Sequence, residues 1–385
     1  MKSYFVDLHI HIGRNIYHKP VKITASKNLT LTNIMLEASE NKGMDMVGVI
    51  DCHAPAVQTE IKKAIQTGNA REIEGGGIRF DRTTLILGSE LEIYDDHCKG
   101  PIHVLCYFRT LSDMERFSEW LQSYMKNIEL SSQRFYGSAV SLQQKVRELN
   151  GLFIPAHVFT PFKSLYGKGV NKSLTEVLDS TLIDAIELGL SSDTDMADQI
   201  KELHSFPYLT NSDAHSLAKI AREYQVMQFN SPCFDEWKLA LKEEGQRKIV
   251  ANYGMNPRLG KYYATVCKKC FSYHNGEVCS ECQSSSYIKG VSDRIKEISS
   301  SSINQSKRPP YIYQVPLEYI PGLGHKTYQK LLDHFGNEMN IIHFVKHQHL
   351  VSIVGQPIAD RIIDLRNGRL SIEKGGGGKY GKVKS

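Results

Sequence analysis

Ionisable side chains stand at the ends of most short apolar segments in the first 250 residues, and this pattern limits the folds open to the chain. Eight apolar runs read as buried strands: residues 4–12, 46–53, 84–93, 102–108, 152–158, 184–188, 208–212 and 224–229. Helical patterns separate many of them, at residues 31–41, 111–125, 138–149, 193–203 and 234–244. The alternation predicts an α/β fold with a parallel sheet or barrel.

The polar groups at these strand ends are the side chains that bind metal ions. They are His9, His11, Asp51, His53, Glu90, His103, His157, Asp213 and His215. The carboxyl ends of parallel barrel strands meet at one rim, and residues two apart on a strand share a face. A lone strand histidine is more often a hydrogen-bonded core residue, but nine such groups together indicate a site. A site rich in imidazole and carboxylate suits Zn²⁺, Mn²⁺ or Fe, and Mg²⁺ is a weaker fit to its imidazoles.

Two CxxC pairs form a second metal motif. Cys267, Cys270, Cys279 and Cys282 have the spacing of a four-thiolate zinc ribbon. A redox dithiol is the weaker interpretation, because the sequence lacks a thioredoxin-like context. Four thiolates leave no open position on zinc, so a structural Zn²⁺ is predicted. Lys268 and Lys269 in the first knuckle are candidate phosphate contacts.

A glycine turn near the C-terminus resembles a helix-hairpin-helix. Gly322 and Gly324 would bring backbone N–H groups at a helix start close to a phosphate, and Lys326 and Lys330 would add charge. A second copy at residues 353–362 contains Pro357, which has no N–H to donate. A purely structural helical turn remains the alternative for both.

Composition divides the chain into four units. They are a region of alternating strands and helices (1–251), a zinc-binding domain with the four cysteines (252–302), a helical unit (303–370) and a basic, glycine-rich tail that is predicted to be disordered (371–385). Residues 252–385 contain 19 lysines and arginines against 10 acidic residues. This excess fits a polyanionic partner, although a solubilising surface would look the same. No apolar run is long enough to span a membrane and no signal peptide is evident, so we expect a cytoplasmic, nucleoid-associated protein.

The motifs of the first 250 residues resemble those of the polymerase-and-histidinol-phosphatase (PHP) superfamily. The resemblance rests on His9-x-His11, Asp51-x-His53, Glu90, His103, His157 and the stretch from Ser212 to His215. It implies a distorted seven-stranded (β/α)7 barrel with a two- or three-metal phosphoesterase site, in which Glu90 bridges ions and Glu90, His157 and Asp213 are catalytic. The family often has an Asp soon after His-x-His; this chain has none there, and His18 is the candidate substitute.

The order of barrel, four-cysteine ribbon and helical unit is similar to that of the endonuclease Q family. This resemblance implies a metal-dependent repair endonuclease that cuts 5′ to uracil, hypoxanthine, xanthine or an abasic site and leaves a 3′-hydroxyl and a 5′-phosphate. Residues 1–251 would be its metal-dependent phosphoesterase domain and residues 303–370 its helical DNA-binding domain. Damaged DNA, single- or double-stranded, would be its partner, with a sliding clamp or repair proteins as further candidates. A base that leaves the stack needs a pocket; Phe159, Phe162 and Tyr166 are the residues predicted to line it.

Two other functions stay open from the sequence. A small-molecule phosphatase of the histidinol-phosphatase type would explain the barrel but would leave the ribbon and the basic region without a use. A non-catalytic sensor of DNA damage would explain those parts, but the nearly complete set of ligands argues against it.

Overall fold

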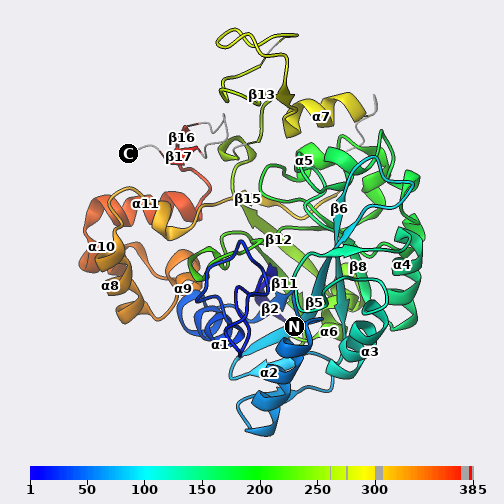
Figure 1. Ribbon diagram of the computed structural model, residues 1–385. Helices are drawn as coiled ribbons and strands as arrows, with labels where there is room; N and C mark the ends of the chain where they lie inside the picture. The colour runs from blue at the N-terminus through cyan, green and yellow to red at the C-terminus, as the bar shows by residue number, and fades with distance from the viewer. Residues whose placement is uncertain (261, 275, 300–306, 374–380, 384–385) are drawn as a thin grey trace.

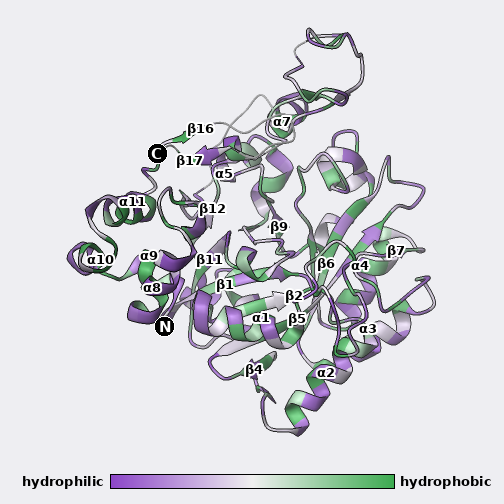
Figure 2. Ribbon diagram, turned by 60° about the vertical axis from the view of Figure 1, so that its left-hand side comes forward, coloured by the Kyte–Doolittle hydropathy of each residue, from purple (hydrophilic) through white to green (hydrophobic). Residues whose placement is uncertain are grey.

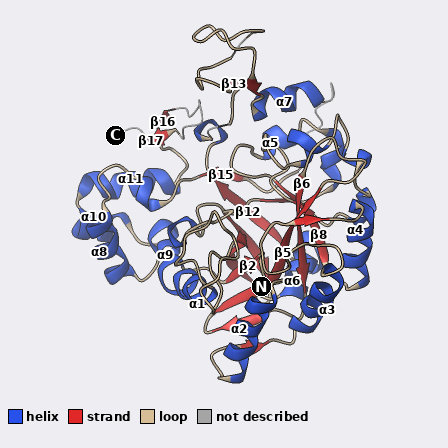
Figure 3. Ribbon diagram, in the orientation of Figure 1, coloured by secondary structure: helices blue, strands red, loops and turns tan. Residues whose placement is uncertain are grey.

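The computed structural model describes residues 1–260, 262–274, 276–299, 307–373 and 381–383. Its main sheet has eleven strands (Figure 3). β1 (Lys2–Ile10), β2 (Met46–Val49) and β5 (Thr83–Ile93) are parallel neighbours at its centre. The predicted boundary at 302/303 and most of the predicted tail lie outside the described residues.

The strands on either side of this centre are mostly antiparallel, which departs from the parallel arrangement expected. β6 (Ile102–Phe108) pairs antiparallel with β5, and β8 (Leu152–Pro155) pairs antiparallel with β6. On the other side β11 (Tyr224–Phe229) and β12 (Lys248–Gly254) are also antiparallel. The reversal has a consequence for function, because it brings His103, at the start of β6, to the rim where β5 ends.

A short parallel pair closes the sheet into a distorted barrel. It consists of β9 (Ile186–Glu187) and β10 (Tyr208–Leu209). The backbone N–H of Val158 donates to the carbonyl of Glu187 (3.0 Å), and that of Ala214 donates to the carbonyl of His9 (3.1 Å). These bonds join the end of β8 to β9 and the segment after β10 back to β1. The α/β barrel predicted from the sequence is confirmed.

Helices cover the outside of the barrel (Figures 1 and 3). Thr30, Thr110 and Ser138 are the N-caps of α1 (Leu31–Leu36), α3 (Leu111–Leu121) and α4 (Ala139–Glu148), since each side chain accepts a backbone N–H of the first turn. In Figure 2 polar and apolar residues alternate along the helices, as expected where one face is buried. The barrel helices are α1 (Leu31–Leu36, continued as a π-helix over Glu37–Lys42), α2 (Pro55–Gln66), α3 (Leu111–Leu121), α4 (Ala139–Glu148), α5 (Thr194–Ala197) and α6 (Phe234–Leu241).

Some of these elements had no clear pattern in the sequence. Helix α2 follows Asp51 and His53 directly, begins at a proline and was not predicted. The helix expected over residues 193–203 is broken into α5 and a 3₁₀ turn, Lys201–Ser205. A small hairpin of β3 (Arg71–Glu72) and β4 (Ile78–Phe80) joins the edge of β5, as does β7 (Arg134–Phe135).

The later parts of the chain pack onto the barrel. The ribbon segment has β13 (Val266–Cys267), β14 (Tyr287–Ile288) and α7 (Val291–Ile298) and lies at the top of Figure 1. β15 (Tyr311–Tyr313) pairs with β12, which itself runs across the predicted boundary at 251/252. The helical unit contains α8 (His325–Phe335), α9 (Glu338–His343), α10 (His347–Val354) and α11 (Gln356–Arg366), followed by β16 (Ile372–Glu373) and β17 (Lys382–Val383). None of the described helices is long and apolar enough to cross a bilayer.

A buried ion pair fastens the helical unit to the barrel. Lys42 Nζ lies 2.5 Å from Glu338 Oε1 at the start of α9, and each side chain is only 4% exposed. We expect Lys42→Met to destabilise the protein by about 3–5 kcal/mol, because it leaves the Glu338 carboxylate buried without its cation. Denaturant unfolding should show this loss, with most of it recovered in Lys42→Met/Glu338→Leu. Lys62→Met, which breaks an exposed pair with Glu115, is the control and should cost under about 1 kcal/mol.

The buried carboxyl group of Glu223, directly before β11, should make the free energy of unfolding depend on pH. Glu223 accepts the N–H of Met255 (2.9 Å), but its Oε2 has no hydrogen-bond partner among the described residues. Burial raises the pKa of Glu223 to about 8. Between about pH 4.5 and 8 the unfolded chain releases this proton and the folded chain keeps it, so stability should fall by up to about 1.4 kcal/mol per pH unit. Glu223→Gln should flatten the decline in unfolding midpoints measured from pH 5 to 8, whereas the exposed Glu119→Gln should leave it as it is.

Candidate active site

A bulge in β1 turns the two histidines of the His-x-His motif into the barrel. Asp7 pairs with Val47 and Ile10 pairs with Val49, so β1 has one extra residue across this interval. Before the bulge Leu8 packs in the barrel interior, and after it Ile10 packs in the outer core. The extra residue therefore changes which residues face inward, and His9 and His11 both point to the rim.

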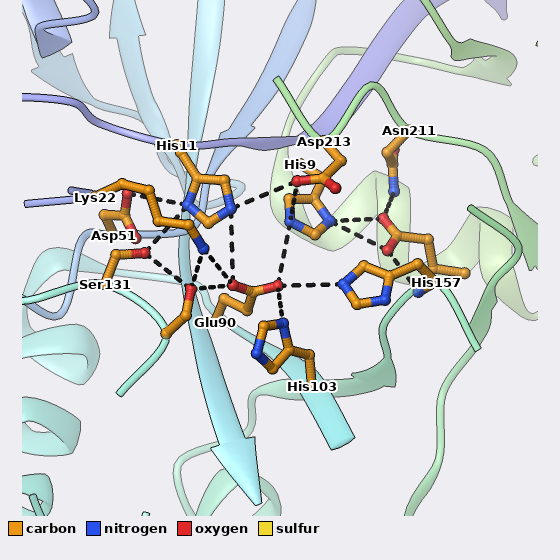
Figure 4. A network of polar contacts seen from close by, with 12 residues as sticks. His9, His11, Lys22, Asp51, Glu90, His103, Ser131, His157, Asn211 and Asp213 are labelled. Atoms are coloured by element: carbon orange, nitrogen blue, oxygen red, sulfur yellow. Dashed lines mark hydrogen bonds and ion pairs between the residues drawn. The ribbon is translucent and has the colours of Figure 1, made fainter. Parts of the chain in front are cut away.

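Glu90 lies at the centre of the predicted ligands (Figure 4). Its Oε1 is 2.9 Å from His103 Nδ1, 3.4 Å from His157 Nε2 and 3.6 Å from His9 Nε2. Its Oε2 is 3.6 Å from His11 Nε2. A carboxylate placed in this way can contact two ions at once.

Asp213 lies on the other side of the two histidines. Its Oδ1 is 3.5 Å from the Nε2 atoms of both His9 and His11, and 3.3 Å from His215 Nε2. Asp213 and His157 both have positive φ, at 45° and 31°, which is uncommon for residues other than glycine. Arg222 holds the Asp213 turn by donating to the carbonyls of Ser212 (2.6 Å) and Asp213 (3.0 Å). Strained backbone kept in place by such bonds is typical of functional sites.

Three groups of these residues have the spacing of metal sites. Each places its ligand atoms within 4.8 Å of one another: His9, His11 and Glu90; His11, Asp213 and His215; Glu90, His103 and His157. Among the described residues, the buried Nε2 atoms of His9 and His11, which face Glu90 and Asp213, have no hydrogen-bond partner. A buried, unsatisfied ring nitrogen is costly, and a bound cation would satisfy it. The residues present therefore fit divalent metal ions.

Other side chains hold the ligands in position. Glu187 accepts from His9 Nδ1 at 2.9 Å, and is itself fixed by the amide of Asn211 (2.8 Å) and the backbone N–H of His157 (2.9 Å). Such carboxylate–histidine pairs orient the imidazole and leave Nε2 free for a metal. Neither Glu187 nor Asn211 was singled out from the sequence, although Glu187 stands at the end of a predicted strand.

Asp51, His53 and His18 lie outside the three groups found among the described residues. Asp51 Oδ2 is 3.3 Å from His11 Nδ1 and accepts the N–H of Ile12 (2.6 Å), so it orients His11. Both ring nitrogens of His53 face oxygens, Ser89 Oγ at 2.9 Å and the carbonyl of Leu130 at 3.4 Å. His18 is exposed, and its position gives no support to the expected substitution for a missing carboxylate.

The electrostatic balance of the cluster favours ionised carboxylates. Burial opposes ionisation of Glu90, but the charges of His103 and Lys22 hold its pKa well below the ordinary value. Burial likewise opposes ionisation of Asp213, while His9 and the hydrogen bond from His11 hold its pKa well below the ordinary value. Carboxylates that stay charged at every working pH are suited to bind cations.

A cavity of about 330 Å³ opens beside the cluster. It is lined by the candidate ligands His157, Asp213 and His215 and by Glu187, Ser191, Asn211 and Tyr262, among others. The predicted base-pocket residues lie elsewhere: Phe159 and Tyr166 are fully buried and stack on each other at 5.3 Å. Phe162 is 47% exposed and packs edge-on against Tyr262.

The four ribbon cysteines converge as predicted. The Sγ atoms of Cys267 and Cys282 are 3.5 Å apart, as are those of Cys270 and Cys279, and all four lie within 4.8 Å. A hydrogen bond from Ser272 lowers the pKa of the Cys279 thiol to about 6, which favours the thiolate that binds metal. Lys268 and Lys269 are exposed beside this site.

The glycine turn of the helical unit also has the geometry expected. Gly322 has a φ of 84°, and Gly324 is the N-cap of α8. Lys326 is exposed near the helix start, but Lys330 donates to the carbonyl of Ile353 (2.7 Å). Lys330 is therefore partly engaged in holding α8 against α10.

Comparisons with known proteins identify the family. No family model matches the chain. It is 53% identical to the uncharacterised protein YqxK of Bacillus subtilis over all of both chains, and 37% identical to the uncharacterised protein MJ0043 of Methanocaldococcus jannaschii over 58% of this chain and 31% of that one. The lesion-specific endonuclease PfuEndoQ of Pyrococcus furiosus superposes with a TM-score of 0.86 at 33% identity, over 100% of this chain and 95% of its own. The chain belongs to the endonuclease Q family. It is a metal-dependent DNA endonuclease.

A second endonuclease Q structure superposes almost equally well. It has a TM-score of 0.85 and 33% identity over 100% of this chain and 96% of that one, and it contains a 27-mer duplex with an abasic lesion at the active site.

Proposed function

We propose that the protein is a repair endonuclease that hydrolyses the phosphodiester bond 5′ to a deaminated base or an abasic site. The products would be a 3′-hydroxyl and a 5′-phosphate. The observation that carries this proposal is the 330 Å³ cavity directly beside the His/Glu/Asp cluster. The candidate ligands His157, Asp213 and His215 line that cavity, so a nucleotide held in it would place its phosphate close to the ligands. Action on DNA would occur at the nucleoid, where a sliding clamp or other repair proteins are candidate partners.

The roles of the chain's own groups follow from the geometry. Divalent ions, when bound, would supply an activated water and neutralise phosphoryl charge. Glu90 would hold ions through both carboxylate oxygens, with His9, His11, His103, His157, Asp213 and His215 as the remaining ligands. Glu187 and Asp51 would orient His9 and His11. His157, Asp213 and His215 line the cavity, so these three ligands would lie closest to a nucleotide bound there.

The cavity is also our proposed pocket for an extruded base. Asn211 and Ser191 line it with polar atoms, and Tyr262 contributes an aromatic ring. Phe162, the exposed member of the predicted set, packs on Tyr262 and would stand at the entrance. Polar groups that pair with a base edge beside a ring that stacks on it are the usual means of reading a flipped base.

A cleavage assay tests the proposal. Labelled duplexes that contain one deoxyuridine, one deoxyinosine or one abasic site would be incubated with the protein and Mg²⁺ or Mn²⁺, beside an undamaged duplex. We expect a single nick 5′ to the lesion, and none with Asp213→Asn, because that variant loses a charged ligand while its shape is kept. Release of phosphate from small monoesters without a nick would instead support a phosphatase.

A further inference from the structure

Lys22 extends into the ligand cluster from the loop that follows β1. Its backbone N–H donates to the carbonyl of Ile12 (2.8 Å), which fixes the base of the side chain. Its ammonium lies 3.2 Å from Glu90 Oε2 and 2.5 Å from Ser132 Oγ, and the side chain is only 14% exposed (Figure 4). A buried lysine in contact with the central carboxylate is part of the site's charge balance.

The ligand atoms themselves limit the number of ions. The Nε2 of His11 belongs to two of the three groups, but an imidazole nitrogen has one lone pair and can bind one ion. The group of His9, His11 and Glu90 and the group of His11, Asp213 and His215 therefore cannot each hold a separate ion through that atom. The group of Glu90, His103 and His157 shares no histidine with them. The described ligands are thus sufficient for two ions.

The two oxygens of Glu90 have different surroundings. Three histidines face Oε1, whereas one histidine, His11, faces Oε2 together with the ammonium of Lys22. Asp51 lies behind His11, and its Oδ1 has no hydrogen-bond partner among the described residues. Carboxylate oxygens thus gather on this side, which would attract a further cation if the ammonium were absent.

We propose that Lys22 is a built-in cation of this centre, which occupies the Oε2 side of Glu90 in place of a third divalent ion. The barrel then binds two ions, and the ammonium neutralises the remaining carboxylate charge. Unlike a metal ion, the Lys22 ammonium is covalently attached and cannot dissociate, so a positive charge lies beside Glu90 Oε2 at any metal concentration. Lys22 acts here through Glu90 and is a positioning residue.

Metal counting on the whole protein tests this proposal. The protein would be loaded with Mn²⁺, freed of excess metal by gel filtration and measured by elemental analysis, with the ribbon zinc as an internal reference for one ion per chain. We expect two Mn²⁺ in the native protein and in Lys22→Arg, and three in Lys22→Glu, which puts a carboxylate where the ammonium was. Three Mn²⁺ in the native protein, or no gain in Lys22→Glu, would overturn the proposal.

A neutral variant gives a second measurement if Lys22→Glu does not fold. Calorimetric titration of Lys22→Met with Mn²⁺ should show tighter binding than the native protein, by several-fold, because a repelling charge has been removed. Equal or weaker binding would mean that Lys22 serves only to hold Glu90 in place. Both measurements are made without DNA, so their outcome does not depend on whether the protein cleaves damaged DNA.

Discussion

Replacing Glu90 by glutamine should lower the rate of DNA cleavage by at least about 1,000-fold, equivalent to about 4 kcal/mol in the barrier. Glu90 belongs to two of the three ligand groups, and its two oxygens face His9, His11, His103 and His157. An amide keeps the shape but is a poor metal ligand and has no charge to offset the ions. The same change should therefore remove bound metal as well as activity.

The matched control is Glu92→Gln, two residues along the same strand. Glu92 is nearer to solvent, pairs with Lys163 at 2.8 Å and lies 3.9 Å from His103 Nε2. Single-turnover cleavage and Mn²⁺ content would be measured for both variants. Glu92→Gln should keep both within a few-fold of the native protein. If Glu90→Gln kept the native metal content and the native cleavage rate, Glu90 would not be the central metal ligand.

The nine candidate ligands were predicted from their positions near strand ends, and the structure brings seven of them together. His9, His11, His157, Asp213 and His215 stand at or just after a strand end, Glu90 lies inside β5 near its end, and all six meet at one rim. His103 stands at the start of its strand, so it reaches that rim because β6 runs antiparallel to β5. Strand direction depends on long-range pairing, which hydrophobic periodicity does not record.

The residues that the sequence did not reveal act through contacts that depend on tertiary structure. Glu187 has the right strand-end position but its role depends on facing His9 from across the barrel. Lys22 has no local signal, because a lysine in a polar loop is ordinarily solvated. Asp51 and His53 have the same pattern as the ligands, yet the bulge in β1 and the start of α2 place them behind His11 and beside Ser89. Bulges and loop paths of this kind are set by packing rather than by local propensity.

The second large effect is expected from removing a zinc ligand of the ribbon, because a segment of this kind folds only when it binds its metal. Cys279→Ser should reduce bound zinc from one ion to none, because serine does not replace a thiolate ligand. The lost binding free energy is about 10–16 kcal/mol for structural zinc sites. Hydrogen exchange should then become fast over residues 262–274 and 276–290, while the barrel strands stay protected. Cys98→Ser, which changes a buried cysteine outside the ribbon, should keep both the zinc and the protection.

Loss of the ribbon should also change how DNA binding depends on salt. Lys268 and Lys269 project from the first knuckle, so they can contact phosphates only while the thiolates hold that turn. Each phosphate contact adds about 0.9 to the slope of log affinity against log salt, so Cys279→Ser should reduce the slope by about 2. Lys268→Gln/Lys269→Gln should give the same reduction with zinc retained. An unchanged slope in the double lysine variant would show that Lys268 and Lys269 do not contact DNA phosphates. If the slope changes in the lysine variant but not in Cys279→Ser, these lysines contact DNA without a folded knuckle.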